Sequence, residues 1–259
     1  MGKDKIIVAL DVATAAEARN IIAELRGEVG AFKVGLQLFT AAGASFVRET
    51  VQAGIKLFLD VKFHDIPNTV AEASREAARL GVWMFNVHAL GGAEMMRRAI
   101  EAAREVCETE NLVQPKIIGV TVLTSANRET LKEVGIERET QEQVSSLARL
   151  TAKCGLDGVV ASPLEIEAIR ATVEEKDFLI VTPGIRGRET RVESRESRIE
   201  NQRPKTKDKI ETIDDQKRVM TAKEAVAAGA DYLVIGRPIL QAEDRISAAR
   251  KIIQEINAV

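Results

Sequence analysis

Eight short runs rich in β-branched and aliphatic residues recur along this chain, and each is followed by a longer stretch with helical spacing. The intervening stretches, such as those at 14–27 and 67–81, carry Ala, Glu, Arg and Leu on a helical repeat. Strands that alternate with helices pair in parallel through crossover connections, so this pattern predicts an α/β protein. The runs span 6–11, 32–36, 56–62, 84–89, 116–123, 158–162, 178–184 and 232–236.

A closed barrel accommodates all eight units in a single domain of 259 residues. The alternative is an open, doubly wound sheet, which usually binds its ligand at a glycine-rich turn after the first strand. Here the first run is followed by Asp11-Val12-Ala13-Thr14, which has no glycine. We therefore predict a single-domain (β/α)8 TIM barrel over residues 1–259. Several predicted helices stop near a glycine, which is the usual C-terminal cap: Gly27, Gly54, Gly81, Gly155 and Gly229.

Composition gives no indication of a nucleic-acid or membrane partner. The formal net charge is −2, and aromatic residues make up 3% of the chain. The apolar run at 6–10 is too short for a signal peptide, and no run approaches the ~18 residues that span a bilayer. Cys107 and Cys154 belong to no CxxC or His/Cys cluster, so neither a metal site nor a disulfide is indicated. We expect a cytoplasmic protein with free thiols.

Charged residues are concentrated at the end of the third predicted strand, in the segment Leu59–Thr69, which reads LDVKFHDIPNT. Residues two apart on a strand point to the same face, so Asp60 and Lys62 are expected to project together. In a barrel of this type the carboxyl ends of the strands form the active-site mouth. Burying ions costs several kcal/mol each unless they pair, so packing alone does not explain Asp60, Lys62 and Asp65.

The segment DVKFHDIPNTV closely resembles the signature of the orotidine 5′-phosphate (OMP) decarboxylase family, in which Asp-x-Lys-x-x-Asp precedes Ile-Pro-Asn-Thr. The resemblance covers nearly the whole chain, because further segments agree in order and spacing. It implies a TIM barrel that converts OMP to UMP without a cofactor or metal, as a homodimer with shared active sites. The further segments are ALDV (9–12), FKVGLQLF (32–39), NVHALGG (86–92), GVTVLTS (119–125), TPGIR (182–186), DDQKRVMT (214–221) and DYLVIGRPI (231–239).

The resemblance also implies roles for individual residues. Lys33, Asp60, Lys62 and Asp65 correspond to an alternating catalytic array, in which Asp65 reaches the active site of the neighbouring subunit. The other correspondences are substrate or dimer contacts: Asp11 for the ribose, Thr69 across the dimer, Thr124, Ser125 and Pro183 for the pyrimidine, and Arg186, Gln216, Gly236 and Arg237 for the phosphate.

The chemistry of the reaction is consistent with these roles. Removing the carboxylate from C6 of a pyrimidine leaves a vinyl carbanion that has no conjugated electron sink. A fixed ammonium, Lys62, would stabilise this charge and supply the proton. Asp60 beside the departing carboxylate would repel it in the ground state. Lys33 and Asp65 would balance the charges of the array and keep Lys62 protonated.

The phosphate site has support independent of the resemblance. Barrels often bind phosphate with the loops after strands seven and eight, beside a helix N-terminus. Arg186 follows the seventh predicted strand, and Gly236-Arg237 follow the eighth at the start of a helix. The phosphate lies far from the reacting carbon, and its binding energy can be used to hold the site closed.

Residues 187–212 interrupt the alternation of strands and helices. They contain eight Lys/Arg and six Asp/Glu, with only Val192, Ile199 and Ile210 as large apolar residues. Such a stretch cannot bury much core, so we expect a solvated excursion; a lid over the site and a partner-binding surface are the functional alternatives. Members of the resembled family have a shorter link at this point.

Three questions stay open from the sequence. A magnesium-dependent sugar-phosphate decarboxylase or hexulose-phosphate synthase of the same barrel superfamily shares the Asp-x-Lys-x-x-Asp core, although residues 66–69 and 124–125 favour a pyrimidine substrate. A non-catalytic barrel that recruits a partner through its charged excursion is a second alternative, which the intact Lys/Asp set argues against. His64 and His88 have no assigned catalytic role, and packing or a dimer contact is the favoured interpretation.

Overall fold

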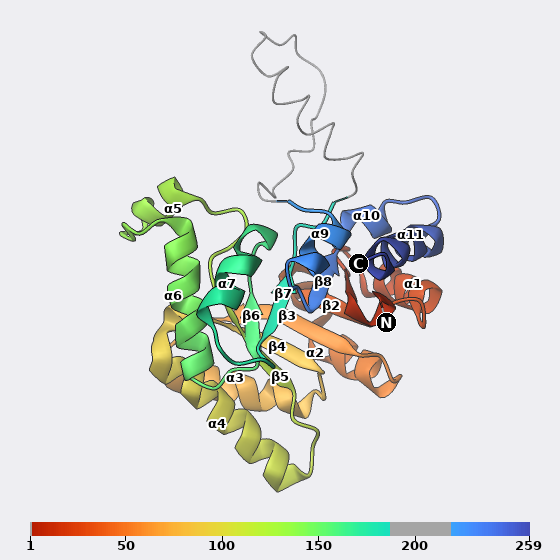
Figure 1. The fold of residues 1–259 in the computed structure, drawn as a ribbon. Coiled ribbons are helices and arrows are strands. Elements are labelled where there is room, and N and C mark those ends of the chain that lie inside the picture. The colour runs from red at the N-terminus through yellow and green to blue at the C-terminus, as the bar shows by residue number, and fades with distance from the viewer. Residues whose placement is uncertain (1, 187–218) are drawn as a thin grey trace, which may run out of the picture.

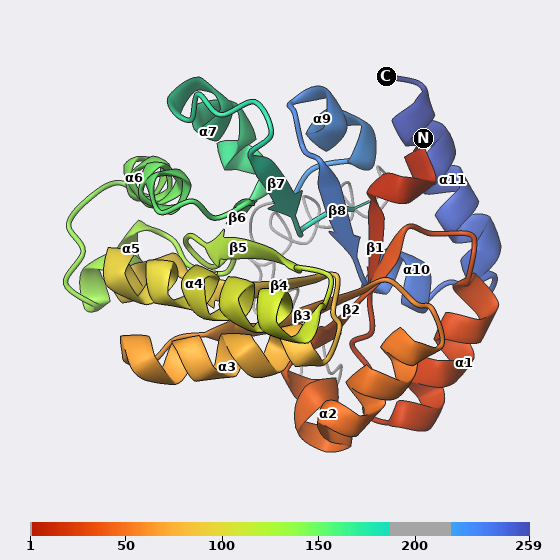
Figure 2. The same ribbon diagram turned by 90° about the horizontal axis from the view of Figure 1, so that it is seen from below.

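The computed structural model describes residues 2–186 and 219–259, and these form a closed barrel of parallel strands in the order β1 to β8. The helices lie around the outside of the barrel (Figure 1), and the two chain ends lie side by side (Figure 2). The backbone N–H of Gly2 donates a hydrogen bond to Asn257 Oδ1 at 3.0 Å. The predicted (β/α)8 barrel is confirmed. The predicted excursion at 187–212 and the predicted phosphate ligand Gln216 lie outside the described residues.

All eight predicted strands are present. Strand β1 pairs with β2 on one side and with β8 on the other, and this double pairing closes the barrel. The fifth strand is shorter than predicted: it ends at Val120, and Val122 and Leu123 lie beyond it and line a cavity. The strands are β1 Ile6–Ala9, β2 Ala31–Gly35, β3 Leu57–Phe63, β4 Met84–His88, β5 Lys116–Val120, β6 Gly158–Val160, β7 Leu179–Thr182 and β8 Tyr232–Ile235.

The helices form where the sequence predicts caps and apolar spacing. In α1 the Thr14 side chain accepts a hydrogen bond from the N–H of Glu17 at 3.2 Å, and Ala18, Ile22 and Leu25 are buried on one face. The five capping glycines named above all have positive φ. The helices are α1 Ala15–Leu25, α2 Leu36–Gln52, α3 Pro67–Arg79, α4 Gly92–Glu110, α5 Arg128–Glu133, α6 Thr140–Lys153, α7 Ile166–Thr172, α9 Ala222–Ala227, α10 Arg237–Leu240 and α11 Arg245–Asn257, with short 3-10 turns at Gly2–Lys5, Ala89–Gly91 and Pro163–Glu165.

Alternation along the strands divides the core into two parts. Outward-facing residues such as Ile6 and Val8 pack under the helices, whereas Ile7 and Ala9 face the barrel interior. Burying each large aliphatic side chain contributes about 1.5–3 kcal/mol, so this core dominates stability. The interior layer consists of Ile7, Ala9, Ala31, Phe58, Met84, Ile118, Val181 and Val234.

Polar residues replace this apolar layer toward the carboxyl ends of three adjacent strands. Lys33 on β2, Asp60 on β3 and Asn86 on β4 each come two residues after an interior apolar residue, and all three are buried. The barrel therefore has a closed apolar floor beneath a polar mouth.

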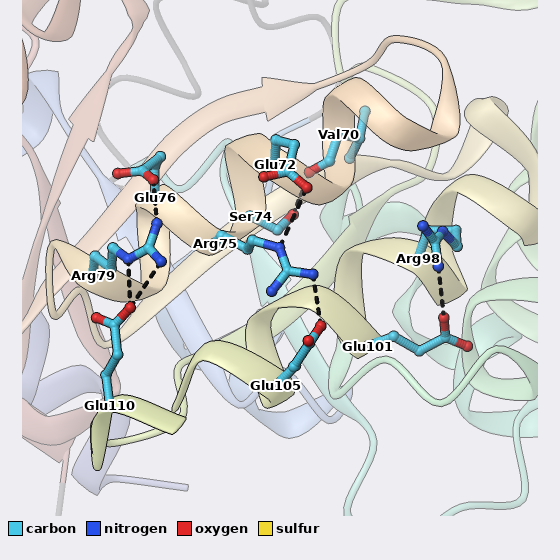
Figure 3. A network of polar contacts seen from close by, with 10 residues as sticks. All are labelled: Val70, Glu72, Ser74, Arg75, Glu76, Arg79, Arg98, Glu101, Glu105 and Glu110. Carbon is cyan, nitrogen blue, oxygen red and sulfur yellow. Dashed lines mark hydrogen bonds and ion pairs between the residues drawn. The ribbon is translucent and has the colours of Figure 1, made fainter. Parts of the chain in front are cut away.

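Helices α3 and α4, which follow β3 and β4, pack against each other (Figure 3). Arg75 Nη2 lies 2.6 Å from Glu105 Oε2, and Arg79 Nη2 lies 2.8 Å from Glu110 Oε1. Exposed ion pairs contribute only about 0–1 kcal/mol each. The buried faces of the two helices therefore hold them together. The ion pairs link α3 to α4 at the exposed edge of this packing.

Cys107 and Cys154 are free and buried, as expected for thiols outside any disulfide framework. Burial raises the pKa of both thiols, and the carboxylates of Glu110 and Glu108 raise that of Cys107 further. Within residues 2–186 and 219–259, no helix combines the length and the apolar character that a membrane crossing requires.

Candidate active site

A cavity of about 530 Å³ lies near the carboxyl ends of the barrel strands. This volume falls within the range of small-molecule sites. Apolar residues, among them Phe58, Val120 and Val160, line part of it. The cavity brings together these residues that the sequence analysis singled out: Asp11, Lys33, Asp60, Lys62, Thr124, Pro183, Arg186, Gly236 and Arg237.

Three predicted site residues do not line this cavity within their own chain. Asp65, Thr69 and Ser125 are all exposed. The Asp65 carboxylate accepts a hydrogen bond from the N–H of Ile66 at 2.7 Å, which turns it toward the start of α3. One chain alone therefore presents an incomplete version of the array that the sequence predicted.

Four charged residues of the cavity, Asp11, Lys33, Asp60 and Lys62, form a chain of ion pairs that alternates in sign. Lys33 Nζ lies 3.1 Å from Asp60 Oδ2 and 3.5 Å from Asp11 Oδ1, and Lys62 Nζ lies 2.7 Å from Asp60 Oδ1. Side-chain exposure is 10% for Lys33 and 12% for Asp60 but 29% for Lys62. Of the two lysines that hold Asp60, Lys62 is therefore the one more open to a bound molecule.

Electrostatics keeps Asp60 and Lys33 ionised. Burial alone would raise the pKa of Asp60, but the charges of Lys33 and Lys62 and hydrogen bonds from Lys62 and Asn86 outweigh it, and the pKa lies below its ordinary value. Burial likewise opposes the charge of Lys33, yet Asp60 and Asp11 raise the pKa of Lys33 above its ordinary value. The cavity thus holds fixed charges at neutral pH, which suits electrostatic stabilisation of a charged transition state.

The backbone that carries Asp60 and Lys62 is irregular, which the sequence did not predict. The strand pairing shifts register between Leu59 and Phe63 of β3, and Lys62 has φ 53°. Asp60 and Lys62 do meet, but a bulge brings them together rather than simple two-residue alternation. A positive φ is uncommon for a residue other than glycine and marks a position that its surroundings must hold.

Asn86 is a site residue that sequence reasoning missed. Its side-chain Nδ2 donates to Asp60 Oδ1 at 2.7 Å, and its Oδ1 accepts from the Lys62 N–H at 2.8 Å. The only available signal was a single amide in the otherwise apolar run Met84-Phe85-Asn86-Val87. An amide that is fully buried in a strand is a candidate for this kind of role because it must find partners.

The two histidines lie against each other beside the array. The rings of His64 and His88 stack with centroids 5.1 Å apart and an interplanar angle of 27°. Burial, followed by electrostatic interactions with His64 and Lys62, lowers the pKa of His88 to about 4. His88 Nδ1 is buried and accepts no hydrogen bond from any described residue. His88 is therefore neutral at physiological pH, and the packing or dimer contact that the sequence favoured for it stays a prediction.

The depressed pKa of His88 predicts acid sensitivity. The unfolded chain binds a proton at His88 near its ordinary pKa, whereas the folded chain resists protonation down to about pH 4. The stability that His88 contributes is therefore present above the unfolded pKa and is lost as pH falls below it. For His88→Gln we expect a smaller loss of unfolding free energy than in the wild type when urea unfolding is compared at about pH 7 and about pH 5. Parallel losses in the two proteins would contradict this assignment.

Known proteins are similar to this chain over nearly its whole length. Residues 4–252 match the model of the family described as "Orotidine 5'-phosphate decarboxylase / HUMPS family". The chain is 49% identical over 256 residues to the orotidine 5′-phosphate decarboxylase of Syntrophotalea carbinolica, covering 99% of this chain and 96% of that protein. It is 51% identical over 258 residues to that of Moorella thermoacetica, covering 99% and 94%.

A solved structure extends the similarity to three dimensions. The orotidine 5′-phosphate decarboxylase of Lactobacillus acidophilus superposes with a TM-score of 0.78 at 33% sequence identity, covering 97% of this chain and 98% of that one. Fold, family match and full-length relatives agree. The chain belongs to the orotidine 5′-phosphate decarboxylase / HUMPS family.

Proposed function

We propose that this protein decarboxylates OMP to UMP in pyrimidine biosynthesis, in the cytoplasm and without a cofactor. The observation that carries the proposal is the alternating Lys33–Asp60–Lys62 array, which shares one cavity with two arginines, Arg186 and Arg237. An anionic substrate with a phosphate at one end and a carboxylate at the other matches these two groups of charges. The curated relatives of similar length carry the name of this activity.

The reaction needs one bond to break and one proton to move. The bond between C6 and the carboxylate breaks, its electron pair stays on C6, and carbon dioxide leaves. Lys62 then gives a proton from its ammonium to C6, and water restores the proton to the amine. The fixed charges beside an apolar wall stabilise the carbanion without having to reorganise. Asp60 stays ionised and repels the departing carboxylate.

The remaining cavity residues orient the substrate. Arg186 and Arg237 bind the phosphate, and Asp11 contacts the ribose. Thr124 and Pro183 contact the pyrimidine. Binding energy from the phosphate end holds the pyrimidine against Lys62, although the phosphate takes no part in the chemistry.

We further propose that the active form is a homodimer in which each chain completes the site of the other. Four large apolar residues are exposed just beyond adjacent strands, at Leu36 after β2, Ile66 after β3, Leu90 after β4 and Leu123 after β5. Exposed apolar groups gathered at one end of a barrel are typical of an interface. Asp65 lies next to Ile66 and outside the cavity of its own chain, so a second copy packed here would receive it.

The alternative, a magnesium-dependent sugar-phosphate enzyme, would need carboxylate oxygens free to bind the metal. Both oxygens of Asp60 already bind cationic or amide donors, namely Lys33, Lys62 and Asn86. This arrangement favours the cofactor-free reaction.

The proposed activity is tested by following the loss of OMP absorbance with purified protein. We expect turnover, and we expect the same rate after dialysis against excess EDTA. Loss of activity with EDTA and recovery with magnesium would support the metal-dependent alternative. Absence of turnover with OMP in either condition would overturn the proposal.

A further inference from the structure

At the mouth of the barrel, β3 and β4 use different numbers of residues between the same two pairing positions. Leu59 pairs with Phe85 and Phe63 pairs with Val87, so β3 uses four residues where β4 uses two. The extra residues form a bulge that contains Asp60 and Lys62. A bulge leaves backbone groups without ladder partners and re-aims side chains, and it needs another group to hold it.

Asn86 is the β4 residue that faces this bulge. It is fully buried, and its one amide group contacts both ends of the bulge. The amide Nδ2 donates to Asp60 Oδ1, and the amide Oδ1 accepts from the backbone N–H of Lys62. The second bond gives the Lys62 N–H a hydrogen-bond partner within the part of β3, between Leu59 and Phe63, where the pairing with β4 shifts register.

We propose that Asn86 is a positioning residue that fixes the Lys62 backbone in its left-handed conformation and aims the Asp60 carboxylate, so that the two charged groups meet in the cavity. Its catalytic consequence rests on the proposed function. Lys62 reaches Asp60 at 2.7 Å from a backbone with φ 53°, and the backbone N–H of this same residue donates to Asn86.

The two contacts have different chemical consequences. The bond to Lys62 sets geometry, because it fixes where the side chain starts. The bond to Asp60 sets both geometry and charge, because a donated hydrogen bond favours the ionised carboxylate. A neutral amide supplies donor and acceptor together, whereas a carboxylate or an aliphatic residue of similar size supplies at most one of them at neutral pH.

Asn86→Ala tests the positioning role. We expect kcat for OMP to fall by about 100-fold, the size of effect that a misplacement near 1 Å can cause, while KM changes much less because the phosphate contacts remain. Asp157→Ala is the matched control: the Asp157 carboxylate accepts the backbone N–H of Ile117 at 2.7 Å, at the opposite end of the barrel. This control removes a comparable bond from a strand and should lower stability without lowering kcat. A kcat for Asn86→Ala within about threefold of the wild type would overturn the proposal.

Asn86→Asp keeps the shape and gives a readout that a purely structural role would not move. At low pH a protonated carboxyl at this position can still donate to Asp60, but at higher pH two carboxylates face each other. We expect the ratio of variant to wild-type kcat to fall as pH rises. A ratio that is constant with pH would contradict the proposal, and this variant remains informative if Asn86→Ala does not fold.

A readout without substrate separates this inference from the proposed function. In the Asn86→Ala protein, carboxyl NMR should show the pKa of Asp60 raised, and a crystal structure should show Lys62 outside the left-handed region. If the wild type did not turn over OMP, the proposed function would fail while these two measurements still decided the role of Asn86. An unchanged Asp60 titration together with an unchanged Lys62 backbone would overturn the positioning role.

Discussion

Lys62→Ala is expected to abolish turnover of OMP while leaving the fold and the binding of UMP largely intact. The variant removes the more accessible of the two ammonium groups that hold Asp60. General acid catalysis alone is typically worth about 10²–10⁴ in rate, and Lys62 also stabilises the carbanion. The fold should survive because Asp60 keeps Lys33 and Asn86 as partners and is not left as an unpaired buried charge.

Steady-state turnover, UMP binding and thermal unfolding together measure this prediction. Lys62→Arg is the matched control for charge, because arginine keeps the positive charge but does not release a proton in a protein. We expect this variant to be nearly as inactive as Lys62→Ala. A Lys62→Ala enzyme that retained more than a tenth of wild-type turnover would contradict the proposed role, since tenfold corresponds to only ~1.4 kcal/mol of barrier.

The barrel could be predicted from the sequence because its signals are local and repeat. Each strand is a short apolar run, and several helices begin with a side-chain cap, as α1 does with Thr14. Parallel pairing then places the carboxyl ends of all strands at one mouth. Lys33, Asp60 and Arg237, which are far apart in sequence, therefore line one cavity without any need to predict a contact between them.

The fine geometry of the site could not be predicted in the same way. Two-residue alternation assumes a regular strand, and the sequence Asp60-Val61-Lys62 contains no signal for the positive φ of Lys62. The role of Asn86 depends on the register shift between β3 and β4. A register shift is defined only once two strands are paired, so neither strand sequence alone reveals it. The stacking of His64 on His88 likewise depends on how the carboxyl ends of β3 and β4 approach each other. Such features arise only when tertiary packing overrides local preference.

The proposed role of Asp65 in the active site of the neighbouring subunit is best tested with mixed dimers. Asp65 is exposed, lies beside an exposed apolar residue, Ile66, and does not line the cavity of its own chain. If it serves the neighbouring subunit, each active site of a homodimer takes Asp60 from one chain and Asp65 from the other. Asp60→Asn and Asp65→Asn should each be inactive as homodimers, because every site then carries one defect.

Mixing the two inactive variants is therefore expected to restore activity. In a heterodimer, one site receives both defects and the other receives neither. Random assortment makes half of the dimers heterodimers with one intact site each, so turnover should recover to about a quarter of the wild-type value per chain.

Exchange of subunits is verified separately with differently tagged chains, and mixing Asp60→Asn with Lys62→Ala is the control. Both defects in that control lie on the same side of the shared site, so every site carries at least one of them and no activity should return. Failure of the Asp60→Asn and Asp65→Asn mixture to recover, with exchange demonstrated, would mean that Asp65 acts within its own chain or outside the site.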